Sequence, residues 1–142
     1  MLEAAVQGAR RGAKQNPPKI VAVTVLTSLD RAAISELGIE KTPADLVDAW
    51  AALAADSGLD GVVASAHEAE KLRRDFGEDF FIVTPGIRPA SSETDDQRRV
   101  VTPAEAIRAG SNVLVVGRPI TGAEDIREAA RVIIEEIASA DS

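Results

Sequence analysis

Two arginines, Arg88 and Arg118, stand at similar places in the sequence and could together hold an anion. Arg88 closely follows the apolar run 80–83, and Arg118 follows the apolar run 113–116 and Gly117. Each guanidinium offers a planar fork of donors that matches a phosphate, and Gly117 lets the backbone approach a ligand closely. A single loop arginine is commonly a solvated charge. The repeated order of glycine, arginine and proline after two expected strands instead predicts one phosphate site between two loops.

A long polar segment follows the first of these arginines. Residues 90–99 come after Pro89 and contain Gln97, whose amide could add a neutral donor to the same anion. Connections of this length without secondary structure are uncommon in compact domains and usually carry function. We therefore include Gln97 in the predicted phosphate site.

Further candidates come from the rule that ligands bind at the C-terminal ends of parallel strands. The residues in such positions are Thr27, Ser28, Ser65 and the stretch from Thr84 to Arg88. No lysine stands at the C-terminal end of an expected strand. The chain thus offers residues that could bind an anion but no evident proton donor or nucleophile.

Metal chemistry is not predicted. His67 is the only histidine, and the chain has no cysteine, so neither a multi-histidine site nor a thiolate site can form. His67 falls in the first turn of an expected helix, where the helix dipole disfavours a charged imidazole. We interpret it as a surface residue.

Composition limits the class of protein. The chain has 142 residues, 45% of them hydrophobic, which suits one domain over residues 1–142. A net charge of -7 and only 3% aromatic residues argue against a nucleic-acid partner. No apolar run approaches the roughly 18 residues that would cross a bilayer, and the N-terminus lacks the apolar stretch of a signal peptide. We therefore expect no membrane partner and a cytoplasmic location.

Strand and helix signals alternate four times after a first helix. Proline and glycine mark most of the boundaries, and Thr42-Pro43 and Thr102-Pro103 are typical helix starts. Helices are expected at 2–13, 30–37, 42–56, 65–76, 102–109 and from 121 onward, and strands at 20–26, 61–64, 80–83 and 113–116. We expect Ser65 and Glu68 to form a capping box, Trp50 to lie on the buried stripe of its helix, and the last helix to bury an isoleucine stripe.

This alternation predicts an α/β fold with a parallel sheet and crossover helices. A doubly wound open sheet and part of a (β/α)8 barrel both fit the pattern. No nucleotide-binding glycine fingerprint follows any strand, whereas phosphate-type features after the last two strands are typical of barrels. A complete barrel needs about 250 residues. The sequence therefore predicts the C-terminal half of a (β/α)8 TIM barrel, with four βα units preceded by a helix.

Several motifs together make the chain resemble one enzyme family. They are Ala22-Val23-Thr24-Val25-Leu26-Thr27-Ser28, Gly58-Leu59-Asp60-Gly61-Val62-Val63, Val83-Thr84-Pro85-Gly86-Ile87-Arg88-Pro89, Asp96-Gln97-Arg98-Arg99 and Val116-Gly117-Arg118-Pro119-Ile120-Thr121. In order and spacing they resemble the bacterial form of orotidine 5'-phosphate decarboxylase, over essentially the whole chain. That family is a barrel of the ribulose-phosphate-binding type.

The resemblance implies a function and roles for matching residues. The family converts orotidine 5'-phosphate to UMP without a cofactor, as a homodimer, in pyrimidine synthesis. By resemblance, Arg88, Gln97, Gly117 and Arg118 would hold the substrate phosphate. Thr27 and Ser28 would contact the ligand, with Ser28 near the pyrimidine amide, and residues 90–99 would form a flap over the substrate.

One departure from the family limits this expectation. The family's Asp-x-Lys-x-x-Asp motif, whose lysine protonates the carbanion as carbon dioxide leaves, does not occur in the sequence. We expect it to belong to an N-terminal half that this chain would need as a partner, and we expect the chain alone to be inactive. Two alternatives remain open: a non-catalytic half-barrel that binds phosphate and pairs with a second copy of itself, or another phosphate-gripping barrel decarboxylase.

Overall fold

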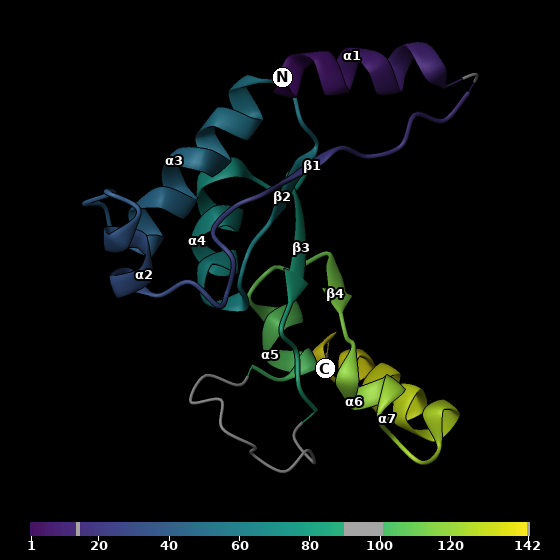
Figure 1. Ribbon diagram of the computed structural model, residues 1–142. Coiled ribbons are helices and arrows are strands. Elements are labelled where there is room, and N and C mark those ends of the chain that lie inside the picture. Colours follow the sequence, from purple (N-terminus) through teal and green to yellow (C-terminus); the bar gives the residue numbers. More distant parts are fainter. Residues whose placement is uncertain (14, 90–100, 142) are drawn as a thin grey trace.

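The protein folds as one parallel β-sheet flanked by helices, with a further helix at each end of the chain (Figure 1). The computed structural model describes residues 1–13, 15–89 and 101–141. Its helices are α1 (Leu2–Gly12), α2 (Arg31–Glu36), α3 (Pro43–Asp56), α4 (Ala66–Phe76), α5 (Pro103–Arg108), α6 (Arg118–Thr121), α7 (Ile126–Ala138) and the 3-10 turn η1 (Ser139–Asp141). Its strands are β1 (Val21–Val23), β2 (Gly61–Val63), β3 (Phe81–Pro85) and β4 (Val113–Val115).

The four strands lie in the order β1-β2-β3-β4, and every neighbouring pair is parallel. Sequential parallel strands that are neighbours in space, each joined by a crossover, form the wall of a barrel. The predicted α/β half-barrel is therefore confirmed. The strand boundaries differ from the prediction: β1 ends at Val23 instead of 26, β2 and β4 each end one residue earlier, and β3 begins one residue later and runs through Thr84 to Pro85 instead of ending at 83. Pro85 is the last residue of the strand, so its missing N–H costs at most one ladder hydrogen bond.

Side-chain caps fix where most helices begin. Thr42 and Asp45 form a reciprocal capping box at α3, and Thr102 and Glu105 form another at α5, both as the sequence predicts. The last helix begins later than predicted. Thr121 ends the short α6, and α7 begins after Asp125, whose carboxylate accepts hydrogen bonds from two backbone N–H groups, both at 3.0 Å. Two charge-assisted bonds make Asp125 the stronger cap.

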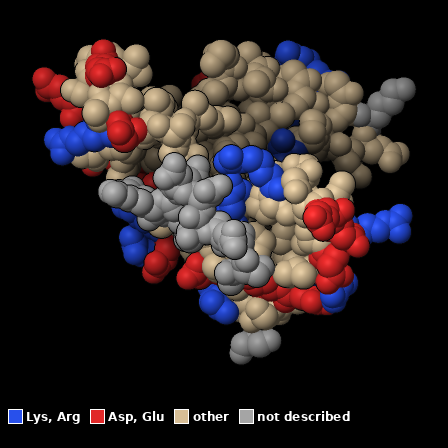
Figure 2. All heavy atoms as spheres, turned by 60° about the horizontal axis from the view of Figure 1, so that its bottom comes forward, with Lys and Arg blue, Asp and Glu red and all other residues tan. Residues whose placement is uncertain are grey.

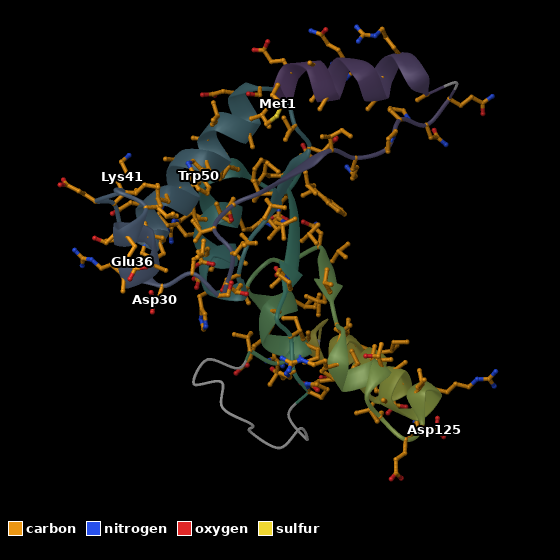
Figure 3. All side chains as sticks on the ribbon, in the orientation of Figure 1. Met1, Asp30, Glu36, Lys41, Trp50 and Asp125 are labelled. Atoms are coloured by element: carbon orange, nitrogen blue, oxygen red, sulfur yellow. The ribbon has the colours of Figure 1, made fainter. Side chains whose placement is uncertain are left out.

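The core lies between one face of the sheet and helices α3 and α4 (Figure 1). Helix α3 turns Leu46, Val47, Ala51 and Ala54 inward, and the two alanines let it approach the strands closely. The prediction for Trp50 was wrong. Its side chain lies at the surface of α3 (Figure 3), because the buried stripe runs through the smaller residues on either side of it.

Helix α7 also differs from its prediction. Of its isoleucine stripe, Ile133 is buried at 4% exposure, whereas Ile126 is 54% and Ile134 is 65% exposed. The stripe is therefore only partly buried.

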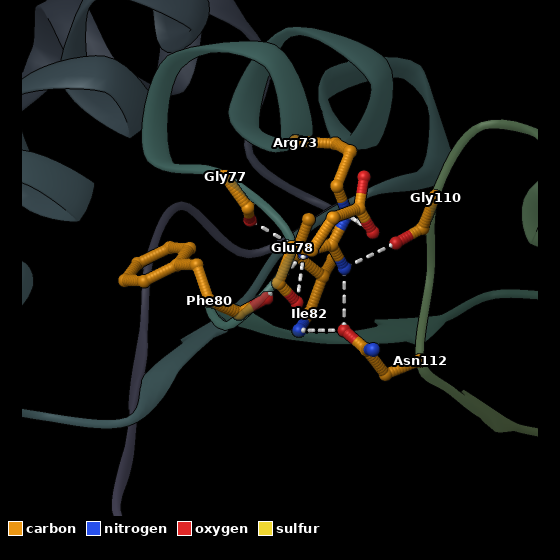
Figure 4. Close-up of polar contacts among 7 residues, drawn as sticks. All are labelled: Arg73, Gly77, Glu78, Phe80, Ile82, Gly110 and Asn112. Carbon is orange, nitrogen blue, oxygen red and sulfur yellow. Dashed lines mark hydrogen bonds and ion pairs between the residues drawn. The ribbon is translucent and has the colours of Figure 1, made fainter.

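A single arginine joins three segments at the N-terminal ends of the strands (Figure 4). Nη1 of Arg73, on α4, donates to the carbonyls of Gly77, Glu78 and Phe80 at 2.7–2.9 Å. Its Nη2 donates to the Gly110 carbonyl and to Oδ1 of Asn112, each at 2.7 Å. The side chain is only 13% exposed. One guanidinium therefore satisfies acceptors from the end of α4, the connection to β3 and the connection to β4.

We expect Arg73→Ala to lower the free energy of unfolding by about 2–4 kcal/mol, because it leaves several partly buried acceptors without a charged donor. Urea unfolding followed by circular dichroism measures the loss. Arg74→Ala is the matched control: Arg74 is 67% exposed and pairs with Asp75 at 3.6 Å, so its loss should stay within about 0.5 kcal/mol. Equal effects of the two substitutions would contradict the role of Arg73.

Gly61→Ala should also destabilise the fold, by roughly 1–3 kcal/mol, because a Cβ on Gly61 would lie 1.8 Å from the Phe81 carbonyl oxygen and force β2 and β3 apart. Gly8→Ala is the opposite control. No atom lies within 4 Å of a Cβ at Gly8, which is inside α1, so alanine there should stabilise by about 0.5–1 kcal/mol. Thermal unfolding of both variants tests the pair, and a harmless Gly61→Ala would show that the strands are not so closely packed.

The α5 capping box should make stability depend on pH. Hydrogen bonds from the backbone N–H and the hydroxyl of Thr102 lower the pKa of Glu105 below its ordinary value of 4.5. A lowered pKa in the folded state contributes stability that is present above pH 4.5 and is lost as the pH falls through the folded-state value. Glu105→Gln should therefore reduce the urea midpoint at pH 7, and its difference from the parent should shrink at low pH. In a Thr102→Val background, the pH-dependent part of the difference in urea midpoint between Glu105→Gln and its parent should be smaller. If that part is unchanged, the capping box is not its source.

Candidate functional site

The loops after all four strands meet at one end of the sheet, the lower end in Figure 1. Figure 2 is turned toward this end, and basic atoms lie near the middle of the face shown. The chain as a whole carries a net charge of -7. A local basic group on an acidic protein is what the sequence predicts for an anion site.

A hollow of about 840 Å³ opens beside the loop that follows β1. The loop contributes Thr27 and Ser28, both exposed, and α4 contributes Ser65 at its N-cap. The other walls come from α2, the first turn of α3, the end of β3 and Val101. The structure thus brings five of the predicted strand-end residues to one hollow, namely Thr27, Ser28, Ser65, Pro85 and Gly86, bordered by the N-terminal ends of α2, α3 and α4.

The start of α4 differs from its predicted capping box. The Ser65 hydroxyl accepts a hydrogen bond from the His67 backbone N–H at 3.2 Å, but the Glu68 side chain does not return to Ser65. Instead Glu68 lines the hollow, and its buried Oε2 has no hydrogen-bond partner in the described part of the chain. His67 is exposed at the edge of the hollow, in agreement with its interpretation as a surface residue.

Arg88 is held by a short continuation of β3 beyond Gly86. Ile87 is buried and forms a parallel bridge with Val101, and the Arg88 backbone N–H donates to the Val101 carbonyl at 3.2 Å. The Arg88 side chain is half-buried, and its Nη1 lies 3.5 Å from the Ile87 carbonyl oxygen. Its backbone is therefore well anchored.

Arg118 is the first residue of α6, and both Arg118 and Gly117 are exposed. The Gly117 carbonyl accepts hydrogen bonds from Ile120 and Thr121 at 2.9 and 3.1 Å, which tie the short helix to the end of β4. The Gly117 N-cap has no side chain to cover the N–H groups of this turn.

Strand register places the ends of β3 and β4, which precede the two arginines, level with each other. Pro85 of β3 pairs with Val115 of β4, and Arg88 and Arg118 each lie three residues beyond this pair. Two neighbouring parallel strands therefore deliver both guanidinium groups to the same end of the sheet. Gln97, the third predicted phosphate donor, and the predicted flap over residues 90–99 lie outside the described residues.

Thr84 was in the list of strand-end candidates, but it has a structural role. It is fully buried, and its hydroxyl is 2.6 Å from the hydroxyl of Ser111, which is 6% exposed. Its position on the helix-covered face of β3 decides this, because side chains alternate between the faces of a strand.

Two further findings concern metals and membranes. Among the described residues, no group of three histidine, cysteine, aspartate or glutamate side chains could hold a metal ion. Within the same residues, no helix is long and apolar enough to cross a membrane.

Comparison with known proteins agrees with this geometry. The family described as orotidine 5'-phosphate decarboxylase / HUMPS matches residues 1–133. The curated orotidine 5'-phosphate decarboxylase of Rhodospirillum rubrum is 56% identical over 125 residues, which are 88% of this chain and 51% of that protein. That of Moorella thermoacetica is 54% identical over 141 residues, 96% of this chain and 56% of that protein. The chain thus spans about half the length of the curated relatives it matches.

Solved structures give the same result. The crystal structure of orotidine 5'-phosphate decarboxylase from Lactobacillus acidophilus superposes with a TM-score of 0.80 at 40% identity, covering 96% of this chain and 58% of that one. The enzyme of that name from Pyrococcus horikoshii, at 23% identity and a TM-score of 0.66, shares the fold. By sequence and by fold, the chain belongs to the orotidine 5'-phosphate decarboxylase / HUMPS family.

Proposed function

We propose that this chain supplies the phosphate-binding side of an orotidine 5'-phosphate decarboxylase, which converts orotidine 5'-phosphate to UMP and carbon dioxide. The observation that carries the proposal is that Arg88 and Arg118 each follow, by three residues, the paired residues Pro85 and Val115 at the ends of neighbouring strands. Family membership supports the reaction type.

In this proposal the phosphate lies between the loops after β3 and β4. Arg88 and Arg118 each give charged donors, and the backbone N–H groups near Gly117 add the positive end of the α6 turn. Gln97 gives a neutral donor, as the resemblance implies. Such contacts are remote from the reacting carbon, and binding energy from remote groups can lower the barrier by holding the substrate in its reactive position.

The pyrimidine end of the ligand would lie toward the hollow that contains Thr27 and Ser28. Neither Arg88 nor Arg118 lines this hollow. Separate places for a charged end and a polar ring suit a nucleotide monophosphate, and the exposed hydroxyls of Thr27 and Ser28 can donate to ring carbonyls or accept from a ring N–H.

We propose that the proton that replaces the carboxylate comes from a lysine outside the described residues. Three lysines belong to the described residues. Lys19 precedes β1 and its ammonium lies over the Phe81 ring, Lys41 precedes α3, and Lys71 pairs with Asp48 and Asp75. None of the three lines the hollow. We propose that a segment forming the other half of the barrel brings the lysine and aspartates. A homodimer of such completed barrels, in the cytoplasm, is the expected form.

A chimeric enzyme tests the assignment. Residues 1–133 replace the matching segment of the Rhodospirillum rubrum relative, and decarboxylation of orotidine 5'-phosphate is followed by absorbance. We expect turnover by the chimera and none by the isolated chain. Arg118→Ala in the chimera should lower kcat/KM by about 10- to 100-fold, the equivalent of one lost charge-assisted contact. Arg127→Ala, an exposed arginine on α7, is the control and should change little.

Two results would contradict the proposal. The first is a chimera that folds, as judged by circular dichroism, but neither binds UMP nor turns over substrate; it would show that this chain does not supply the phosphate-binding side. Turnover by the isolated chain would show that its own residues contain the proton donor. Binding of UMP by the isolated chain, without turnover by the chimera, would favour the alternative of a non-catalytic phosphate-binding module.

A further inference from the structure

One carboxylate oxygen at the hollow is buried without a donor. Glu68 is the third residue of α4, and Asp45 and Glu105 hold the same position in α3 and α5. Those two carboxylates accept hydrogen bonds from their N-cap threonines. Glu68 does not return to its own cap, and its Oε2 has no partner in the described part of the chain. Because buried polar atoms are almost always hydrogen-bonded, a donor is expected to reach this oxygen when the site is at work.

The hydroxyl groups around the hollow narrow the choice of donor. Among the described residues four hydroxyl side chains line it. The Thr42 hydroxyl already donates to Asp45 at 2.6 Å, and the Ser65 oxygen is held by the backbone N–H at the start of α4. Thr27 and Ser28 lie in the turn after β1, and both are exposed. The turn after β1 therefore carries the two hydroxyl groups that are least constrained.

Charged donors are less suitable. Arg31 and His67 also line the hollow, but both are exposed, and neither forms an ion pair with Glu68 among the described residues. Exposed ion pairs gain little, because each charge is already well solvated. A neutral hydroxyl that turns inward gives up less hydration than either cation would.

We propose that Glu68 is a positioning residue that accepts the hydroxyl hydrogen of Ser28 and leaves the Ser28 oxygen as an acceptor toward the ligand. The inference rests on the proposed function, which places the pyrimidine ring of the nucleotide at this hollow. Ser28 is preferred to Thr27 as the donor because a β-branched side chain is restricted at χ1. An ionised carboxylate has no hydrogen to give, so the direction of this hydrogen bond is fixed.

That direction decides which ring the site prefers. The uracil ring carries an N–H between its two carbonyl groups, whereas the cytosine ring has an unprotonated nitrogen at the same place. A Ser28 oxygen whose own hydrogen points to Glu68 can accept from the uracil N–H but cannot donate to the cytosine nitrogen. Two acceptors then face each other without a donor, which costs binding free energy. Glu68 therefore makes the site select uracil over cytosine without touching the ring.

The burial of Glu68 favours this indirect role over direct contact with the ligand. Its Oε2 is buried, so a ligand cannot reach that oxygen as readily as a neighbouring side chain can. Ala66 and Ala69 beside it on α4 are buried, so the helix holds the carboxylate at a fixed place. Ser28 is exposed and belongs to a turn that the Leu29 N–H closes onto the Leu26 carbonyl at 2.9 Å.

Two nucleotides that differ only at the base isolate this selectivity. UMP and CMP carry the same ribose and phosphate, so the ratio of their dissociation constants cancels what Arg88 and Arg118 contribute. Both are titrated by calorimetry into the chain and into its chimera with the Rhodospirillum rubrum relative, each as parent, as Glu68→Met and as Glu70→Met. Methionine keeps the length of the side chain without a carboxylate, and Glu70, exposed on the same helix, is the matched control.

We expect the parent to bind UMP about tenfold more tightly than CMP or better, and Glu68→Met to reduce this ratio by about five- to tenfold, because the Ser28 hydroxyl then turns to suit either ring. Glu70→Met should leave the ratio unchanged. In a Ser28→Ala background, Glu68→Met should change the ratio no further, since the carboxylate acts only through this hydroxyl.

Thermal unfolding gives a second readout. A buried oxygen without a partner does not stabilise the fold, so Glu68→Met should leave the thermal midpoint unchanged or raise it by about 2–4 °C. A carboxylate with a purely structural role would instead lower the midpoint when it is removed, and would leave the ratio of the two dissociation constants as it was.

The inference is overturned if the parent binds UMP and CMP equally, if Glu68→Met keeps the full preference for UMP, or if neither nucleotide binds to either protein. Equal binding of both nucleotides that Arg118→Ala weakens would support the proposed phosphate site and contradict this inference alone. A preference for UMP that depends on Glu68, with both affinities unaffected by Arg118→Ala, supports this inference and contradicts the proposed phosphate site.

Discussion

The register between β3 and β4 is the constraint on which the site depends, and Arg73 and Asn112 hold it. Oδ1 of Asn112 accepts from the Ile82 backbone N–H at 2.8 Å and from Arg73 at 2.7 Å, so the side chain just before β4 is fixed to the second residue of β3. Because the strands are parallel, a register set at their N-terminal ends also sets which residues leave together at their C-terminal ends. This register pairs Pro85 with Val115, and Arg88 and Arg118 each lie three residues beyond that pair, although Arg73 and Asn112 lie at the opposite end of the sheet.

This arrangement separates stability from ligand binding. The N-terminal ends of the strands hold the buried guanidinium and the hydrogen bond from Ile20 to Asp60, at 2.6 Å, which agrees with a structural role for that aspartate. The C-terminal ends hold exposed hydroxyls and half-buried or exposed arginines, whose donors are available to a ligand. Such a division is general in parallel α/β folds, because loops at one end can vary without disturbing the other.

The two faces of the sheet differ in burial. The core between the sheet and α3 and α4 is well packed, with Val62, Ile82 and Ala51 fully buried. On the opposite face, Val23 and Val113 of the two outer strands are 59% and 41% exposed, whereas Val63 and Val83 of the two inner strands are half-buried.

Much could be predicted from the sequence because the signals were local. Proline and glycine marked the helix ends, and Thr42-Pro43 and Thr102-Pro103 predicted where α3 and α5 begin. Predictions that needed distant neighbours failed or were not possible. Trp50 and the α7 isoleucines have helical spacing, but only the packing decides which face is buried. The role of Arg73 depends on acceptors up to 39 residues away in sequence, so no local pattern reveals it. The sequence determined which residues are candidates to bind phosphate; the tertiary structure decided, through strand register, that Arg88 and Arg118 follow neighbouring parallel strands at the same end of the sheet.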